Sequence, residues 1–282
     1  MTMKKACHIN ISRIRLKLWL ALSLRLAKFV SNLPGSSSKQ KQLNVKQARF
    51  FEELGLNYIQ ARDKLNSLCQ RLFQTNYDSA NGMWSDHLIY FTALSAAGFK
   101  PRKILEIGTF KGETTKILAE LFPESSIRTL DISKKEMLQK GIYLYAINSS
   151  MDLFEHRRHN IGNVSNVDFN ELNSLFLTLE IGEYDLIWLD GAHGYPIAAI
   201  DFTNCIRMLS RQGKLVCDDV YLNIWKEDPN YFSKAIIDTL RAFSQAKIIS
   251  YKMIFKRTDL ENNIWKNQTK YVAIAEKCRE SN

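Results

Sequence analysis

Acidic side chains stand at the ends of two apolar runs in the second half of the chain. Asp190 follows the run 184–189, with His193 three residues further on, and Asp218 and Asp219 follow a second run. If the two runs are neighbouring parallel strands, the three carboxylates converge, because ligands of such sheets bind beyond the carboxyl ends of the strands. Converging carboxylates repel each other unless a cation is present, and hard oxygen ligands suit Mg²⁺ or Mn²⁺.

This set of residues predicts chemistry on a hydroxyl group. A cation held by Asp190, Asp218 and Asp219 would bind two substrate oxygens and lower the pKa of a hydroxyl. His193 is near enough in sequence to act as general base or as a further ligand. The alternative is structural: adjacent aspartates only cap the next helix, and His193 is an ordinary loop histidine.

A cofactor turn is predicted in the stretch 103–115. An apolar run, 104–107, indicates a buried strand, and Gly108 and Gly112 bracket a tight turn before a helix. Glycine allows positive φ and close approach of a ligand to the backbone, and a helix start favours a polar or anionic group. Phe110 replaces the middle glycine of the dinucleotide pattern G-x-G-x-x-G, which makes a nicotinamide dehydrogenase a poor fit.

Two carboxylates flank this turn. Glu106 is placed to meet a cationic amino group, directly or through water. Asp131 ends the next apolar run, where a carboxylate accepts both hydroxyls of a ribose. The alternative here is a glycine turn that serves packing alone.

Together these residues resemble the class I S-adenosylmethionine-dependent methyltransferases. The motif LEIGTF-x-G resembles the catechol and caffeoyl-CoA O-methyltransferase branch. The motif DGAHGY, followed by L-x-x-x-G-x-L-x-x-DDV, resembles metal-dependent (Methyltransferase 24-like) enzymes that methylate sugar hydroxyls of macrolides and related glycosides. The resemblance covers roughly residues 84–276. It departs from the family at Arg211-Gln212-Gly213, where a Gly-Gly turn is usual.

The resemblance implies S-adenosylmethionine as cofactor and Mg²⁺ at the acceptor. It implies catalytic roles for His193, as base, and for Asp190. The implied metal ligands are Asp190, Asp218 and Asp219. Adenine is expected near the end of the third strand, in contact with Asp168, Asn170 or Ser174. The implied cofactor-binding residues are Glu106, Gly108, Thr109, Phe110, Gly112, Asp131, Ile132 and Asp190.

These motifs need a sheet to position them. From residue 102 onward, apolar runs alternate with helical patterns, which predicts a parallel sheet with helices on both faces. The last two runs predict an antiparallel pair. The predicted fold is therefore α/β, a Rossmann-like seven-stranded class I methyltransferase sheet, mostly parallel with an antiparallel last strand, plus an N-terminal helical extension. The predicted strands are 103–107, 127–130, 164–169, 184–189, 213–217, 246–254 and 270–276.

The N-terminal part differs from the rest in composition. The formal net charge is +10, and much of it lies in the first 50 residues, where Lys and Arg recur almost without acids. Residues 13–30 mix leucine with Lys and Arg, which predicts an amphipathic helix on a membrane surface, on its own domain or on a second copy. The uncharged run 18–24 is too short to span a bilayer, and residues 33–38 read as a linker. The predicted segments are 1–40 (basic segment and linker), 41–83 (helical cap) and 84–282 (methyltransferase domain).

Two further segments surround the motifs. Residues 41–75 predict helices that cap the sheet or a dimer partner, and a short helix, 88–97, follows His87, which we interpret as a surface or capping residue. The connection 133–163 contains a helix and a basic cluster that faces an anionic substrate or belongs to a solvated loop. That cluster is His156, Arg157, Arg158 and His159.

The cysteine content and the absence of known binding signatures narrow the set of functions that the sequence predicts. Five scattered cysteines without a C-x-x-C pair predict neither zinc nor a disulfide framework, and a reducing cytoplasmic setting, with contact at the inner membrane face through residues 13–30, fits best. No RNA-binding signature is found, so nucleic acid is not an expected partner. Two rivals stay open: a hydroxylase-like protein on the same scaffold, and a membrane-docked binding protein without catalysis. The sequence does not name the acceptor or the oligomeric state.

Overall fold

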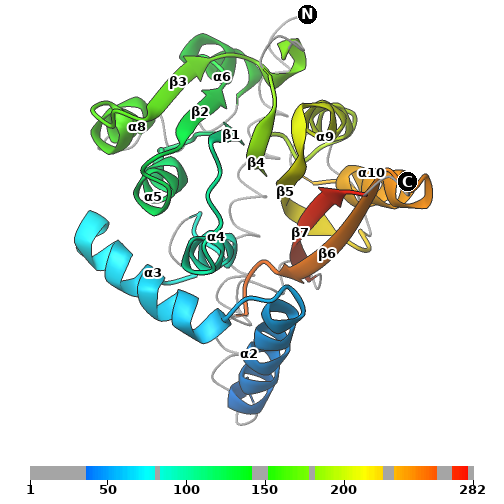
Figure 1. The fold of residues 1–282 in the computed structure, drawn as a ribbon. Helices are drawn as coiled ribbons and strands as arrows, with labels where there is room; N and C mark the ends of the chain where they lie inside the picture. The colour runs from blue at the N-terminus through cyan, green and yellow to red at the C-terminus, as the bar shows by residue number, and fades with distance from the viewer. Residues whose placement is uncertain are drawn as a thin grey trace, which may run out of the picture.

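Seven strands form one mixed sheet in the order β3-β2-β1-β4-β5-β7-β6 (Figure 1). The computed structural model describes residues 36–79, 83–141, 152–177, 182–224, 232–258 and 269–278. Strands β1 to β5 pair in parallel, whereas β7 runs antiparallel to both β5 and β6. The predicted fold class is confirmed. The strands are β1 (Lys103–Ile107), β2 (Ser126–Asp131), β3 (Val167–Glu171), β4 (Tyr184–Leu189), β5 (Leu209–Tyr221), β6 (Ile249–Phe255) and β7 (Lys270–Lys277).

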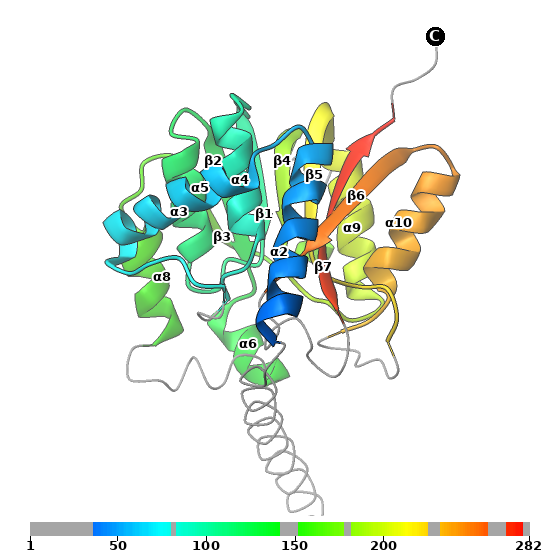
Figure 2. The same cartoon turned by 90° about the horizontal axis from the view of Figure 1, so that it is seen from below.

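Helices cover both faces of this sheet (Figure 2). Successive strand residues point to opposite faces, so Ile104 of β1 joins one hydrophobic cluster and Leu105 joins the other. The first face carries α2 (Ser36–Glu53), α3 (Tyr58–Phe73), α4 (His87–Ala96) and α5 (Glu113–Leu121), with α8 (Leu153–Ile161) against α5. The second face carries α9 (Ile197–Met208) and α10 (Ala235–Gln245).

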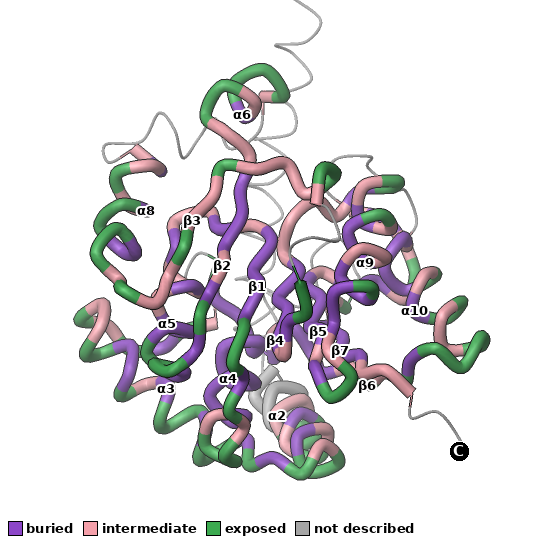
Figure 3. The backbone as a smooth tube through the Cα atoms, turned by 45° about the horizontal axis from the view of Figure 1, so that its top comes forward, coloured by how far each residue is buried: buried purple, intermediate pink, exposed green. Residues whose placement is uncertain are grey.

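The central strands are the most buried part of the molecule, and the outer faces of the helices are exposed (Figure 3). Helix α4 is an exception among the helices, because eight of its ten residues are buried. It lies between α3 and the sheet, which explains why its sequence is apolar on every side. Trp188 of β4 is fully buried and packs against Phe91 of this helix.

The predicted cap consists of two helices that share the core of the sheet. Gly55, with φ 72°, separates α2 from α3, and the side chain of Asn57 caps the start of α3. Phe51 and Leu65 are fully buried in the same cluster as Trp188. The prediction of a linker over 33–38 is wrong from Ser36 onward, where α2 begins. Residues 13–30, predicted to contact a membrane, lie outside the described residues.

Three strands differ most from their predicted bounds. β3 begins and ends later, at Val167 and Glu171; β6 begins three residues later; and β5 extends on both sides of the predicted run. The shift of β3 matters most, because it moves the carboxyl end of that strand to Glu171. Within the described residues, no helix is both long and apolar enough to cross a membrane.

Candidate active site

The turn after β1 lies directly against the end of β4. Gly108 has φ 101°, and a Cβ built there would stand 2.1 Å from the carbonyl oxygen of Asp190. Its N–H donates to the carbonyl of Leu130 at the end of β2 (2.8 Å). Gly108 is therefore required by the packing of three strand ends. Gly112, with φ 74°, starts α5 and faces Ile161 of α8.

Glu106 is enclosed between β1 and α5. Its carboxylate is fully buried, and one oxygen accepts hydrogen bonds from the hydroxyls of Thr115 and Thr129. Thr129 also lies 2.6 Å, oxygen to oxygen, from the hydroxyl of Thr109. The second oxygen of Glu106 has no hydrogen-bond partner among the described residues. Burial raises the pKa of Glu106 to about 7, although both threonine hydroxyls oppose that rise.

Asp131 forms a buried ion pair that the sequence did not indicate. Arg157 of α8 donates to its Oδ2 at 2.6 Å, and also to the carbonyl oxygen of Phe110 at 2.7 Å. The N–H groups of Phe110 and Ile132 donate to the same carboxylate, both at 2.9 Å. Three donors on a group with about four acceptor positions leave room for one more, where the sequence predicted two ribose hydroxyls. Burial raises the pKa of Asp131, and Arg157 opposes the rise.

The residues of the predicted basic cluster on α8 differ in burial. Arg157 is buried and stacks over the ring of Phe169, with 4.6 Å between the guanidinium carbon and the ring centroid. Arg158 and His159 are exposed. Phe110 and Ile132 lie beside Asp131 in a small apolar cluster with residues of α6 (Lys134–Lys140) and α8. Apolar side chains therefore lie next to Asp131, where a nucleoside base would need them.

Asp218 and Asp219 reach the same point because β5 is irregular between them. In a regular strand neighbouring side chains alternate between faces. Here the pairing with β7 shifts between Cys217 and Val220, and Asp219 adopts φ 49°. This bulge turns both carboxylates toward one ammonium group, that of Lys256.

Lys256 and Lys270 are the cations of this cluster, and the sequence reasoning missed both. The Lys256 ammonium contacts Asp218 Oδ2 and lies 2.6 Å from Asp219 Oδ1, and only 5% of its side chain is exposed. Lys270 Nζ lies 2.9 Å from Asp219 Oδ2. Lys256 directly follows β6, and Lys270 is the first residue of β7. No local signal identifies them, since their partners are 37 to 51 residues away in sequence.

His193 and Asp190 complete the cluster. His193 Nε2 lies 3.5 Å from Asp190 Oδ1 and 3.9 Å from Asp219 Oδ2. Burial lowers the pKa of His193, so its imidazole is neutral at pH 7. Burial, reinforced by Asp218, raises the pKa of Asp190 well above its ordinary range. One oxygen each of Asp190 and Asp218 has no hydrogen-bond partner among the described residues.

The donors for the predicted Mg²⁺ are only partly in place. One ligand atom each from Asp190, His193 and Asp218 lies within 4.8 Å of the others. Asp219 differs, because both of its oxygens are bound to ammonium groups. A divalent ion held by Asp218 would also lie close to Lys256, which shares that carboxylate. A divalent and a unit positive charge about 4 Å apart repel by roughly 8 kcal/mol at an effective dielectric constant of 20. Lys256 therefore competes with a divalent ion for the carboxylates of Asp218 and Asp219.

His87 is not the surface residue that the sequence indicated. It is 1% exposed and stacks on Trp188, with 4.3 Å between ring centroids. Its Nδ1 lies 2.6 Å from the hydroxyl of Ser85. Burial lowers the pKa of His87 to about 3, so it is a neutral core histidine.

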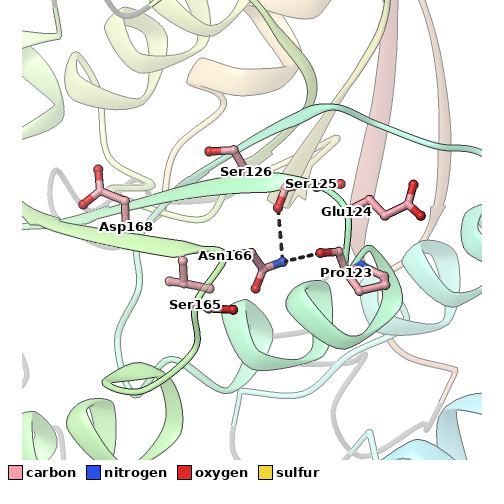
Figure 4. Close-up of a pocket in the computed structure, with 8 residues that line it drawn as sticks. Pro123, Glu124, Ser125, Ser126, Ser165, Asn166 and Asp168 are labelled. Carbon is pink, nitrogen blue, oxygen red and sulfur yellow. Dashed lines mark hydrogen bonds between the residues drawn. The ribbon is translucent and has the colours of Figure 1, made fainter.

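Two surface cavities lie away from this cluster. The first, of about 350 Å³, is at the amino ends of β2 and β3, where the Asn166 side chain donates to the carbonyls of Pro123 and Ser125 (Figure 4). Asp168 lines it and is level with Arg128, three register positions before Asp131, whose partner on β3 is Glu171; this places Asp168 away from the end of β3 where adenine was expected. The second, of about 390 Å³, lies between α3 and α8 and is lined by Trp84, Glu113, His156 and His159, among others.

Comparison with known families identifies the scaffold. A family model described as a methyltransferase domain matches residues 105–220, from β1 to the end of the Asp218–Asp219 bulge. The match includes Asp131, Asp190 and both aspartates of the bulge. This part of the chain is therefore similar to a methyltransferase domain, as the motifs predicted. The strand order, with β7 antiparallel between β5 and β6, is the sheet expected of this domain.

Similar solved structures transfer methyl groups to different atoms. The O-methyltransferase TomG of Streptomyces achromogenes, solved with S-adenosylmethionine, is 17% identical and has a TM-score of 0.47, with 85% of this chain and 99% of that chain covered. A Podospora anserina methyltransferase bound to S-adenosylhomocysteine is 18% identical (TM-score 0.47; 78% and 88% covered). The N-methyltransferase NodS of Bradyrhizobium japonicum is 13% identical (TM-score 0.47; 67% and 93% covered). No curated protein matches the chain significantly.

Proposed function

We propose that the chain is an S-adenosylmethionine-dependent O-methyltransferase that acts on a hydroxyl of a sugar or another small molecule. The observation that carries this proposal is the convergence of Asp190, His193, Asp218 and Asp219 at the ends of β4 and β5, next to the Gly108 turn. A neutral imidazole beside carboxylates suits deprotonation of a neutral hydroxyl.

The cofactor side of the site binds a nucleoside. Bound S-adenosylmethionine supplies a methyl group on a positively charged sulfur. Asp131 offers its remaining acceptor position to a ribose hydroxyl, and Phe110 and Ile132 offer an apolar surface to the base. The turn at Gly108 lies between the ends of β2 and β4, where its N–H donates to Leu130 and its Cα faces the carbonyl of Asp190. Glu106 stabilises the turn by accepting hydrogen bonds from the hydroxyls of Thr115 and Thr129.

The acceptor side moves the proton. Nε2 of His193 would accept the proton of the acceptor hydroxyl, whose oxygen would take the methyl group that bound S-adenosylmethionine supplies. Asp190 and Asp219, both within 4 Å of that nitrogen, stabilise the imidazolium that forms. The products are a methyl ether and S-adenosylhomocysteine. Most of the acceleration comes from holding the oxygen in line with the methyl group.

Calorimetry with S-adenosylhomocysteine tests the cofactor assignment. The full-length protein should bind it, and Asp131→Ala should weaken binding about tenfold or more, since a hydrogen bond to a charged group contributes about 1.5–3 kcal/mol. Because Asp131→Ala leaves Arg157 buried without its carboxylate, Asp131→Asn serves as a milder second variant. Asp238→Asn, on the exposed side of α10, is the matched control and should bind normally. A folded wild-type protein without measurable binding would refute the proposal.

The mass of the product tests the reaction. Incubation with S-adenosylmethionine and extracts enriched in glycans or glycolipids should yield an acceptor heavier by about 14 mass units, as expected for a methyl group. A gain of about 16 mass units would indicate oxygen insertion and favour the hydroxylase-like alternative. Labelled methyl donor then shows which fraction contains the acceptor.

A further inference from the structure

Lys256 is the most completely buried cation of the acceptor site. It follows directly after β6, and its ammonium lies between Asp218 and Asp219. Lysine is rarely buried unless it is paired. The exposed fractions of the two partner side chains are only 2% and 11%. The Lys256 ammonium is therefore a buried, ion-paired group of the acceptor site and not a surface charge.

The backbone around Lys256 is fixed from several directions. Its N–H donates to the carbonyl of Lys270 (3.0 Å), and its own carbonyl accepts from the N–H of Asp86 (2.8 Å). The neighbouring Phe255 is held on both backbone groups by the buried side chain of Gln47. On the other side, the guanidinium of Arg257 donates to the carbonyl of Trp84 at 2.9 Å.

These contacts give the N-terminal helices a role at the site. Gln47 belongs to α2, and its amide also donates to Asp86, just before α4. The helical extension therefore helps to hold the short segment 255–257 that presents the ammonium. Such support is expected for a group whose position matters, because a site needs a rigid surrounding to keep its geometry.

We propose that Lys256 is the resident cation of the acceptor site and takes the place that a divalent metal ion would otherwise occupy between the strand-end carboxylates. Lys256 is then a positioning residue: it holds Asp218 and Asp219 together, so that Asp190 and His193 face the acceptor. The proposal rests on the proposed function for the meaning of the acceptor site, but its test does not require turnover.

Charge balance supports this assignment. Asp218 and Asp219 carry two formal negative charges, and Lys256 and Lys270, which contact them, return two positive charges. The two paired carboxylates are balanced in this way, where two formal negative charges would remain without the lysines. A divalent ion added to the cluster would make it positive. The repulsion between the carboxylates, from which the sequence predicted a metal ion, is already reduced by the two ammonium groups.

Binding of Mn²⁺ to the full-length protein tests the proposal, measured by water-proton relaxation. The wild-type protein should not bind Mn²⁺ at millimolar concentration. Lys256→Met should bind it at least tenfold more tightly, because the variant frees a carboxylate oxygen of each aspartate and removes the repelling charge. Adding Asp190→Asn to Lys256→Met should abolish the gain. The matched control is Lys214→Met, which removes a paired lysine from β5 at a distance from the cluster.

A second variant keeps the test decisive if Lys256→Met fails to fold. The double variant Lys256→Met/Asp219→Asn removes one negative charge together with the lysine, and should also gain Mn²⁺ binding through Asp190, His193 and Asp218. Submillimolar Mn²⁺ binding by the wild-type protein that Asp190→Asn removes would overturn the proposal. So would a folded Lys256 variant that gains nothing. Binding of S-adenosylhomocysteine, measured in parallel, reports separately on the proposed function.

Discussion

The two halves of the site use buried carboxylates in different ways. At the ends of β1 and β2, Glu106 and Asp131 receive donors on most of their oxygens: two threonine hydroxyls for the first, and two backbone N–H groups and Arg157 for the second. At the ends of β4 and β5, three carboxylates and a neutral histidine share two lysines. Glu106 and Asp131 are thus held mainly by neutral donors and one guanidinium, whereas Asp218 and Asp219 are held by ammonium groups.

Glu106 and Asp219 show the effect of these different partners in the directions of their pKa shifts. Burial raises the pKa of Glu106 to about 7, because only neutral hydroxyls donate to it. The pKa of Asp219 lies well below its ordinary value, because Lys256 and Lys270 outweigh the effect of burial. A carboxylate with ammonium partners stays ionised at the pH of the cell and keeps a fixed charge for the reaction. A carboxylate held by hydroxyls alone serves the structure of the turn.

Gly108 is where the two halves touch, and its substitution should have the largest effect. Gly108→Ala would force a side chain into positive φ and place it 2.1 Å from the Asp190 carbonyl oxygen, so a strand end must move. We expect the free energy of unfolding to fall by at least about 3 kcal/mol. For a chain of this size that corresponds to a drop in melting temperature of roughly 6–12 °C, measurable by calorimetry.

Gly98→Ala separates the steric effect from the backbone effect. Gly98 has φ 83°, and a Cβ there would meet no atom within 4 Å. Its substitution should therefore cost only the strain of the left-handed backbone, about 1–2 kcal/mol. Equal losses in the two variants would show that the contact between the β1 turn and Asp190 is not what Gly108 provides.

The sequence predicted the strand ends well and their partners poorly. Alternating apolar runs were enough to identify seven strands, and parallel pairing then placed Asp131, Asp190 and Asp218 at one edge of the sheet. Arg157 and Lys256 pair with acids 26 and 38 residues away. Such contacts depend on how helices and connections pack on the sheet, which periodicity does not encode.

The errors also have physical causes. His87 reads as a capping residue from its position before an apolar helix, but α4 is buried on every side, so its first turn is buried too. The bulge at Asp218–Asp219 was not visible as a pattern, since a single residue in the left-handed conformation leaves no signature when that residue is aspartate. The cap helices were found because their apolar spacing is strong.

Glu106→Gln should change the pH dependence of the free energy of unfolding, with an effect smaller than that of Gly108→Ala. The pKa of Glu106 is about 7 in the folded protein against an ordinary 4.5, so between these values the folded state binds more protons than the unfolded state. The free energy of unfolding of the wild type therefore falls as pH rises from about 4.5 to 7, by up to about 3 kcal/mol from this group. The glutamine side chain of the variant cannot titrate, so this part of the fall should disappear.

Urea unfolding of both proteins at pH 5 and pH 7 measures the effect. The variant should gain on the wild type by about 2 kcal/mol between the two pH values, and other acids cancel in the difference. Glu124→Gln, at an exposed position, should show no such gain. A parallel pH profile for wild type and Glu106→Gln would mean that Glu106 is solvated and that the cofactor side is open to water.

His193→Asn should have the smallest effect on the fold and the most selective one on function. The side chain is 20% exposed, and its nearest carboxylate oxygen is 3.5 Å away, so it contributes no strong hydrogen bond to the acceptor side. We expect the free energy of unfolding to change by less than about 0.5 kcal/mol, as for other substitutions without a buried partner.

Binding of S-adenosylhomocysteine to His193→Asn should change less than twofold, because Asp131 and the Gly108 turn are untouched. Methyl transfer should fall by about 10²–10⁴-fold once an acceptor is known, the usual contribution of a general base. If His193→Asn instead weakened binding of the nucleoside as strongly as Asp131→Ala, the division into a cofactor half and an acceptor half would be wrong, and His193 would have to be assigned to the former.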